Sequence, residues 1–122
     1  MVQRTMPRDN AAGPTITATA PCRADLAGGT IDLWPLYLFH PGAMTLNFAL
    51  NIRTTCRLTP LKNKRIELRS IDTRREETFT SIEHLKEAKR YRLPLAAYLV
   101  RFFAAGQGVR IETNSESPAG AG

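Results

Sequence analysis

The segment from Met44 to Leu58 constrains the fold most strongly, because apolar side chains recur there at every second residue. The apolar positions of this parity are Met44, Leu46, Phe48, Leu50, Ile52, Cys56 and Leu58, and only Thr54 interrupts them. Most residues between them are threonine, asparagine or arginine. Successive side chains of a strand point to opposite faces, so the pattern predicts a long strand with one face on a core and the other facing solvent or substrate.

Shorter strands are predicted on both sides of this segment. They cover residues 16–20, ending at Pro21, and residues 65–71, 76–80 and 109–113. In the strand at 65–71, Ile66 and Leu68 share a parity and are expected to face the core.

Two helices are predicted after residue 80. Ser81 has the side chain of an N-cap, and Glu83 lies in the first turn, where a negative charge stabilises a helix start. This helix is expected to end near Tyr91. Pro94 then begins a second helix, which Gly106 ends. The apolar face of the second helix, which we assign to the core, contains Leu95, Tyr98, Leu99, Phe102 and Phe103.

The composition indicates one folded domain, since the chain has 122 residues and 43% of them are hydrophobic. No apolar run approaches the roughly 18 residues of a membrane span. Residues 1–14 are polar, lack the apolar core of a signal peptide and are expected to form a flexible leader. Cys22 and Cys56 are then reduced thiols of a cytoplasmic protein, and a metal site has little support.

The net charge of +6 favours anionic partners. The basic residues that gather around one expected turn are Lys62, Lys64, Arg65, Arg69, Arg74 and Arg75. An RNA-binding surface is one interpretation of this group. The solvated edge of a hairpin is favoured over it, because no aromatic stacking motif is interleaved with the charges. Nucleic acid is therefore disfavoured as a partner.

The first stretch with chemical character is APCRADLAGGTIDLWP, from Ala20 to Pro35. Its Gly-Gly turn lets a ligand approach the backbone closely. Asp25 and Asp32 can accept hydrogen bonds from the hydroxyl groups of a polyol, and Arg23 can stabilise negative charge near a reacting oxygen. The competing interpretation is a Gly-Gly turn with solvated charges, because isolated glycine patterns carry little information.

The second stretch is SPAGAG, from Ser117 to Gly122, after the strand predicted at 109–113. A glycine-rich loop that follows a strand can direct its backbone N–H groups at phosphate oxygens. The competing interpretation is a flexible tail. The sequence contains neither a Walker-type phosphate loop nor the GxGxxG dinucleotide fingerprint.

Taken together and in this order, the two stretches resemble the N-terminal part of the GHMP kinases, a family named for galactokinase, homoserine kinase, mevalonate kinase and phosphomevalonate kinase. The first is similar to the P-x-R-x-D-L-A-G-G-x-x-D form of heptose- and fucose-type sugar kinases. SPAGAG resembles the opening of the motif P-x-G-x-G-L-G-S-S-x-A, broken off after its second glycine. The resemblance implies that residues 15–122 are an incomplete N-terminal domain and that the C-terminal domain is absent.

The resemblance also implies an activity: the full-length enzyme transfers the γ-phosphoryl group of ATP, with Mg²⁺, to a sugar or sugar phosphate. It places Arg23 near the phosphoryl acceptor as the catalytic residue and Asp32 on a substrate hydroxyl. The remaining implied assignments are Asp25, Gly28 and Gly29 for the substrate, and Pro118, Gly120 and Gly122 for the nucleotide phosphates. Asp25 is equally suited to holding the turn together.

The implied fold is α+β, with a mainly antiparallel sheet backed by helices, like a domain of ribosomal proteins. The serine half of the phosphate loop, the magnesium ligands and the catalytic aspartate of many members lie outside this chain, so we expect the isolated chain to be inactive. The helix that follows the loop in the family is also missing. Part of the sheet is therefore expected to be uncovered and to promote self-association.

Some positions depart from the family pattern and leave alternatives open. Cys22 replaces the glycine usual before the motif arginine, and the stretch 29–32 lacks the Glu-His-Thr-Asp of galactokinases, which disfavours galactose. A mevalonate-type or other metabolite kinase is one alternative. A non-catalytic sugar-binding protein is another, in which Trp34 would report a bound sugar unless it is a core residue.

Overall fold

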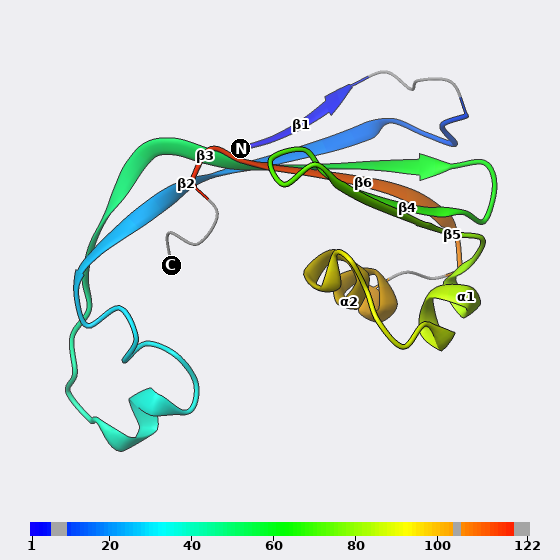
Figure 1. Ribbon diagram of the computed structural model, residues 1–122. Coiled ribbons are helices and arrows are strands. Elements are labelled where there is room, and N and C mark those ends of the chain that lie inside the picture. The colour runs from blue at the N-terminus through cyan, green and yellow to red at the C-terminus, as the bar shows by residue number, and fades with distance from the viewer. Residues whose placement is uncertain (6–9, 104–105, 119–122) are drawn as a thin grey trace.

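The computed structural model describes residues 1–5, 10–103 and 106–118 (Figure 1). Its elements are β1 Val2–Thr5, β2 Thr15–Ala27, the 3₁₀ helix η1 Leu36–Phe39, β3 Leu46–Leu61, β4 Ile66–Ser70, β5 Arg75–Phe79, α1 Ile82–Glu87, α2 Pro94–Phe103 and β6 Gly108–Ser115. None of the helices described is long and apolar enough to cross a membrane.

The strands form one six-stranded sheet in the order β1-β2-β3-β6-β4-β5. Neighbouring strands are antiparallel except β4 and β6, which are parallel. Helices α1 and α2 lie on one face, below the end of the sheet that contains β4, β5 and β6 (Figure 1). At the other end β2 and β3 bend away as a two-stranded arm, which carries the loop with η1 (Figure 1). The predicted α+β fold, a mainly antiparallel sheet backed by helices, is confirmed.

The core lies between the two helices and the strands β4 and β5. Its buried members are Ile66, Leu68, Phe79, Ile82, Leu85, Ala97 and Val100. The carboxylate of Glu77 on β5 accepts hydrogen bonds from the backbone N–H groups of Arg92 (3.0 Å) and Leu93 (2.8 Å), immediately before α2. The core thus packs α1 and α2 against the end of the sheet that contains β4 and β5. Ile66 and Leu68 face this core, as predicted.

Helix α1 begins as predicted, because the Ser81 side chain accepts a hydrogen bond from the backbone N–H of His84 (3.3 Å). The prediction that it ends near Tyr91 is wrong, since it ends at Glu87 and the following Ala88 is extended. Tyr91 instead donates its hydroxyl hydrogen to the Leu85 carbonyl (2.8 Å). The same carbonyl also accepts a hydrogen bond from the Ala88 N–H (3.3 Å), so two donors hold the end of the helix.

The assignment of the apolar face of α2 to the core is wrong, because all five of its side chains are exposed: Leu95 76%, Tyr98 58%, Leu99 48%, Phe102 82% and Phe103 74%. Helix α2 carries apolar residues on nearly every side, so more than one of its faces is able to pack against the sheet. The face that is buried contains the smaller Ala97 and Val100. Leu95, Leu99 and Phe103 instead line an open hollow between the helix and the sheet.

Strand β3 has the predicted alternation, but much of its apolar face is uncovered. Leu46, Phe48 and Leu58 are exposed, because the helices lie below only the other end of the sheet (Figure 1). The uncovered sheet expected from the sequence is therefore present in the described part of the chain.

The prediction that a strand ends at Pro21 is wrong, because β2 continues to Ala27. Thr19 exchanges backbone hydrogen bonds with Met1 (both 2.9 Å), so residues of this parity direct their backbone groups toward β1. Pro21 has the same parity and lies beyond Met1, where no described strand pairs with that edge. A proline without an N–H group therefore breaks no ladder bond at this position.

The first residues of the chain are not uniformly irregular, as a flexible leader over residues 1–14 would be. Val2–Thr5 forms β1 and pairs with β2 in an antiparallel register. Ala11 is buried and forms a β-bridge with Leu61. These contacts extend the sheet by an edge strand.

We expect Leu68→Ala to lower the free energy of unfolding by about 2–5 kcal/mol, because Leu68 is 1% exposed and its loss leaves a cavity. The matched control is Leu95→Ala, which removes the same atoms from a side chain that is 76% exposed and is expected to cost under about 0.5 kcal/mol. Urea titration followed by circular dichroism measures both. Equal losses would contradict the position of the core.

Candidate functional site

Arg23, Asp25 and Asp32 of the first motif meet where the arm passes into its loop. The guanidinium of Arg23 donates from Nη2 to Oδ2 of Asp32 (2.7 Å) and forms an ion pair from Nε to Oδ1 of Asp25 (3.1 Å). The register of β2 against β3 shifts between Pro21 and Arg23 and again between Asp25 and Ala27. Such irregularities re-aim side chains. The structure thus brings together all three charged residues predicted for the site.

The charges of this cluster favour a permanently charged guanidinium. The hydrogen bond to Asp32, followed by the charge of Asp25, raises the pKa of Arg23. Within the described residues, neither Nη1 of Arg23 nor Oδ1 of Asp32 makes a hydrogen bond. Arg23 is half-exposed, and both carboxylates are partly exposed. The cluster therefore presents an accessible donor and an accessible acceptor close together.

The glycines of the motif form the base of the loop. Gly28 has a φ of +75°, and a Cβ there would collide with the carbonyl oxygen of Met44. Its own carbonyl accepts hydrogen bonds from Thr45 Oγ1 (3.1 Å) and from the Ile31 N–H (3.0 Å). A Cβ on Gly29 would lie 2.6 Å from Oδ2 of Asp25. The two glycines thus close the loop and leave room for Asp25.

An open pocket of about 340 Å³, here called the loop pocket, lies within residues 31–45. It is lined by Ile31, Asp32, Tyr37, His40, Pro41, Gly42, Ala43 and Thr45. Gly28 and Gly29 are not among the lining residues. Trp34 is 75% exposed, so it is not a core residue.

Tyr37 and His40 belong to no motif in the sequence that predicted a site. The available signal is their spacing of three residues across η1, but a pair of this kind is common and does not mark a site by itself.

The end of β6 is fixed to β3 next to the second motif. Glu116 donates its N–H to the Arg53 carbonyl (3.0 Å), and the Arg53 N–H donates to Oε2 of Glu116 (2.7 Å). The Ser117 N–H donates to Oγ of Ser115 (3.2 Å). Pro118 is exposed, whereas Gly120 and Gly122 lie outside the described residues.

A line of polar side chains connects this strand end with the first motif. The Cys22 thiol lies 3.6 Å from Oγ1 of Thr54, which lies 3.2 Å from Oγ of Ser115. Cys22 immediately precedes Arg23, and Pro118 follows Ser115 by three residues. The two motifs are far apart in sequence, but their flanks are separated by the width of one strand.

The basic residues do not form one cluster around one turn, which corrects the expectation from the sequence. Lys62, Lys64 and Arg65 lie before β4, and Arg74 and Arg75 lie after it. On the face of the sheet opposite the helices, Arg110 is paired with Glu67 (2.7 Å) and Arg69 with Glu112 (3.9 Å). Because some of these arginines are paired with glutamates and the other basic residues lie at two separate turns, the arrangement is more typical of a solvated surface than of a nucleic-acid-binding surface.

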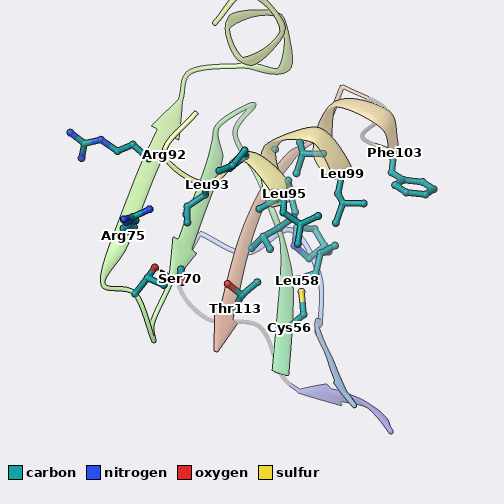
Figure 2. Close-up of a pocket in the computed structure, with 18 of the residues that line it drawn as sticks. Cys56, Leu58, Ser70, Arg75, Arg92, Leu93, Leu95, Leu99, Phe103 and Thr113 are labelled. Atoms are coloured by element: carbon teal, nitrogen blue, oxygen red, sulfur yellow. Dashed lines mark hydrogen bonds between the residues drawn. The ribbon is translucent and has the colours of Figure 1, made fainter. Parts of the chain in front are cut away.

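A larger hollow, here called the apolar groove, has a volume of about 820 Å³ and lies between α2 and the sheet (Figure 2). Leu95, Leu99 and Phe103 line it from the helix side, and Cys56 and Leu58 from β3 (Figure 2). Burial raises the pKa of the Cys56 thiol, which therefore remains protonated. Most of the exposed lining surface is apolar, although Ser70, Arg75, Arg92 and Thr113 also line the groove (Figure 2).

The apolar groove is also remote from the charged cluster. Roughly 20 Å of extended strand separates Cys56 from Ala49, the β3 partner of Arg23. Among residues 1–5, 10–103 and 106–118, no group of three or more His, Cys, Asp or Glu side chains is placed to hold a metal ion.

We expect Gly28→Ala to destabilise the protein more than Gly42→Ala. Both glycines have a positive φ, so each alanine carries a backbone cost of about 1–2 kcal/mol. Only at Gly28 does the new Cβ also meet a carbonyl oxygen, whereas nothing lies within 4 Å of it at Gly42. Urea titration of both variants measures the difference in unfolding free energy. A Gly42→Ala variant that is as unstable as Gly28→Ala would contradict the close approach to Met44.

Two solved structures that are similar to this chain are those of sugar kinases. No protein-family model matches the sequence, and no curated protein sequence matches it at a significant level. A solved structure of a D-glycero-D-manno-heptose 1-phosphate kinase from Bacteriodes thetaiotaomicron is 26% identical, with a TM-score of 0.66 over 87% of this chain. A protein from Campylobacter jejuni assigned as a sugar kinase is 21% identical, with a TM-score of 0.56 over 88% of this chain, and shares the fold.

This chain covers 35% of the length of each of those two proteins. The chain therefore has the fold of the N-terminal domain of a sugar kinase, in agreement with the resemblance of its two motifs to the GHMP kinase family.

Proposed function

We propose that this chain is the substrate-binding part of an ATP-dependent kinase that phosphorylates a sugar or a sugar phosphate. The observation that carries the proposal is the proximity of its two motifs. The cluster of Arg23, Asp25 and Asp32 and the start of the glycine-rich segment flank one strand, with Thr54 between them. A kinase must hold its acceptor and its nucleotide next to each other, and two motifs on either side of one strand are close enough to do so.

The chemistry of phosphoryl transfer depends on positioning and on neutralisation of charge. The free Nη1 group of Arg23 is suited to bind an oxygen of the transferring group, and the free Oδ1 of Asp32 is suited to accept a substrate hydroxyl hydrogen. Asp25 binds the edge of the guanidinium formed by Nε (3.1 Å) and Nη2 (3.3 Å). It therefore acts as a positioning residue for Arg23.

The nucleotide would be held by the segment that begins at Pro118 and contains Gly120 and Gly122. Reciprocal bonds between Glu116 and Arg53 direct the chain out of β6 at this point. When bound, Mg²⁺ supplies neutralisation of phosphate charge in such enzymes. Among the described residues, no group of three or more His, Cys, Asp or Glu side chains is placed to hold the ion, so we assign it no step. The resemblance to the family leads us to expect its ligands outside this chain.

The chain spans about a third of the solved sugar kinases that it matches, so the activity is proposed for a longer protein. We expect the isolated chain to transfer no phosphoryl group. A mevalonate-type acceptor and a purely sugar-binding role are the alternatives. The manno-heptose phosphate named for the first structural neighbour favours a sugar over mevalonate.

The proposal is tested first by reading the coding sequence after the Gly122 codon. We expect it to continue in frame with a Leu-Gly-Ser-Ser-like segment and a second domain. The full-length product should then consume ATP with a sugar or sugar phosphate, whereas the purified 122-residue chain should not. A stop codon directly after Gly122, or turnover by the short chain, would contradict this account.

In that full-length product, Arg23→Gln should lower kcat by about 10²–10³-fold, because it removes a positive charge beside the reacting group. The sugar KM should change less. Arg57→Gln is the matched control, since Arg57 pairs in register with Glu112 and lies on the face opposite the helices. Loss of activity in both variants alike would point to general destabilisation and count against the role of Arg23.

We further propose that the short chain self-associates through its uncovered apolar side chains. These are Leu46, Phe48, Leu58, Leu95, Leu99, Phe102 and Phe103. An exposed apolar surface of this extent favours association. Sedimentation velocity over a range of concentrations, together with binding of an apolar dye, measures it. A monomer that binds no dye would contradict the proposal, and Phe103→Ser should weaken association relative to the parent chain.

A further inference from the structure

The loop pocket contains polar side chains that the proposed function has not used. We propose that it binds ring hydroxyl groups of the sugar substrate, and that Tyr37 and His40 recognise them together with Asp32. The proposal rests on the proposed function and names the residues that select the substrate.

The loop is closed by its own hydrogen bonds, which give the pocket fixed walls. The Gly28 carbonyl accepts from Ile31 at one end of the loop and from Thr45 at the other. The N–H of Ala43 donates to the His40 carbonyl (3.1 Å), and the N–H of His40 donates to the Tyr37 carbonyl (3.4 Å). Successive turns therefore bring residues from the whole loop into one lining.

The lining offers donors and acceptors that match a hydroxyl group, which both donates and accepts. Oδ1 of Asp32 accepts, and Thr45 retains acceptor capacity after donating to Gly28. The Tyr37 hydroxyl and the His40 ring are able to donate. Within the described residues, neither of these two groups makes a hydrogen bond. They are available to a ligand.

The rest of the lining suits the carbon atoms of a sugar ring. Ile31, Pro41 and Ala43 supply apolar surface beside the polar groups. The volume of about 340 Å³ lies within the usual range for a small-molecule site. Ligand pockets typically combine such apolar walls with a few orienting polar groups.

The charge of the lining separates hydroxyl groups from phosphate. Asp32 is its single carboxylate, and no lysine or arginine lines the pocket among the described residues. A phosphate group would be repelled by the Asp32 carboxylate at close range. The pocket therefore holds the uncharged part of the substrate, and the phosphate of a sugar phosphate lies on the Arg23 side of Asp32.

The proposal is tested by NMR titration of the ¹⁵N-labelled 122-residue chain with D-mannose, D-mannose 1-phosphate and inorganic phosphate. Both sugars should cause saturable shifts in residues 31–45, and inorganic phosphate should not. Tyr37→Phe, which removes one hydroxyl, should raise the Kd of the sugars about two- to tenfold. His40→Ala should have an effect of similar size. Tyr98→Phe is the matched control on α2 and should leave the Kd unchanged.

Shifts confined to other segments, no shift with either sugar, or an unchanged Kd for Tyr37→Phe would each overturn the proposal. The measurement needs neither ATP nor turnover. A full-length product that binds sugar in this loop but transfers no phosphoryl group would contradict the proposed function alone. Transfer without involvement of residues 31–45 would contradict the pocket alone.

Discussion

The pairing of β2 with β3 is the interaction on which the rest of this structure depends. It runs from Ile16 opposite Leu58 to Ala27 opposite Leu46, and most of this length has no helix below it (Figure 1). The arm therefore keeps its shape through backbone hydrogen bonds more than through burial. The same β3 pairs with β6 on its other side, so one strand positions the sugar-side loop and the start of the glycine-rich segment.

The charged cluster at the end of the arm contributes more to geometry than to stability. Exposed ion pairs contribute little to stability, and Arg23 is half-exposed. Asp25 nevertheless binds Nε and Nη2 of its planar guanidinium, and Asp32 binds Nη2, which fixes the direction of the remaining N–H groups. A ligand then meets a side chain that is already oriented, and less conformational entropy is lost on binding.

Local patterns predicted much of the backbone. The alternation in β3, the inward Ile66 and Leu68 and the cap at Ser81 depend on neighbouring residues, and the structure has them. The buried face of α2 was not predictable in this way, because the apolar pattern of the helix favours the large side chains, such as Leu95, Leu99 and Phe103, whereas the face that meets the core contains Ala97 and Val100.

The candidate site also has a part that the sequence predicted and a part that it did not. Arg23, Asp25 and Asp32 were expected from a motif, and the structure brings them together, whereas Tyr37 and His40 share a pocket with Asp32 only because the loop closes on the Gly28 carbonyl. The closure of a loop produces no periodic pattern in the sequence, so these two residues were not predicted.

In β3, Thr54 is the one residue that interrupts the apolar series, and its hydroxyl group contacts both Cys22 and Ser115. Valine at this position would complete the apolar series but would remove both contacts. The threonine therefore departs from the strand pattern where a contact between distant segments needs a hydroxyl group, and relatives that keep both motifs should keep a hydroxyl group here.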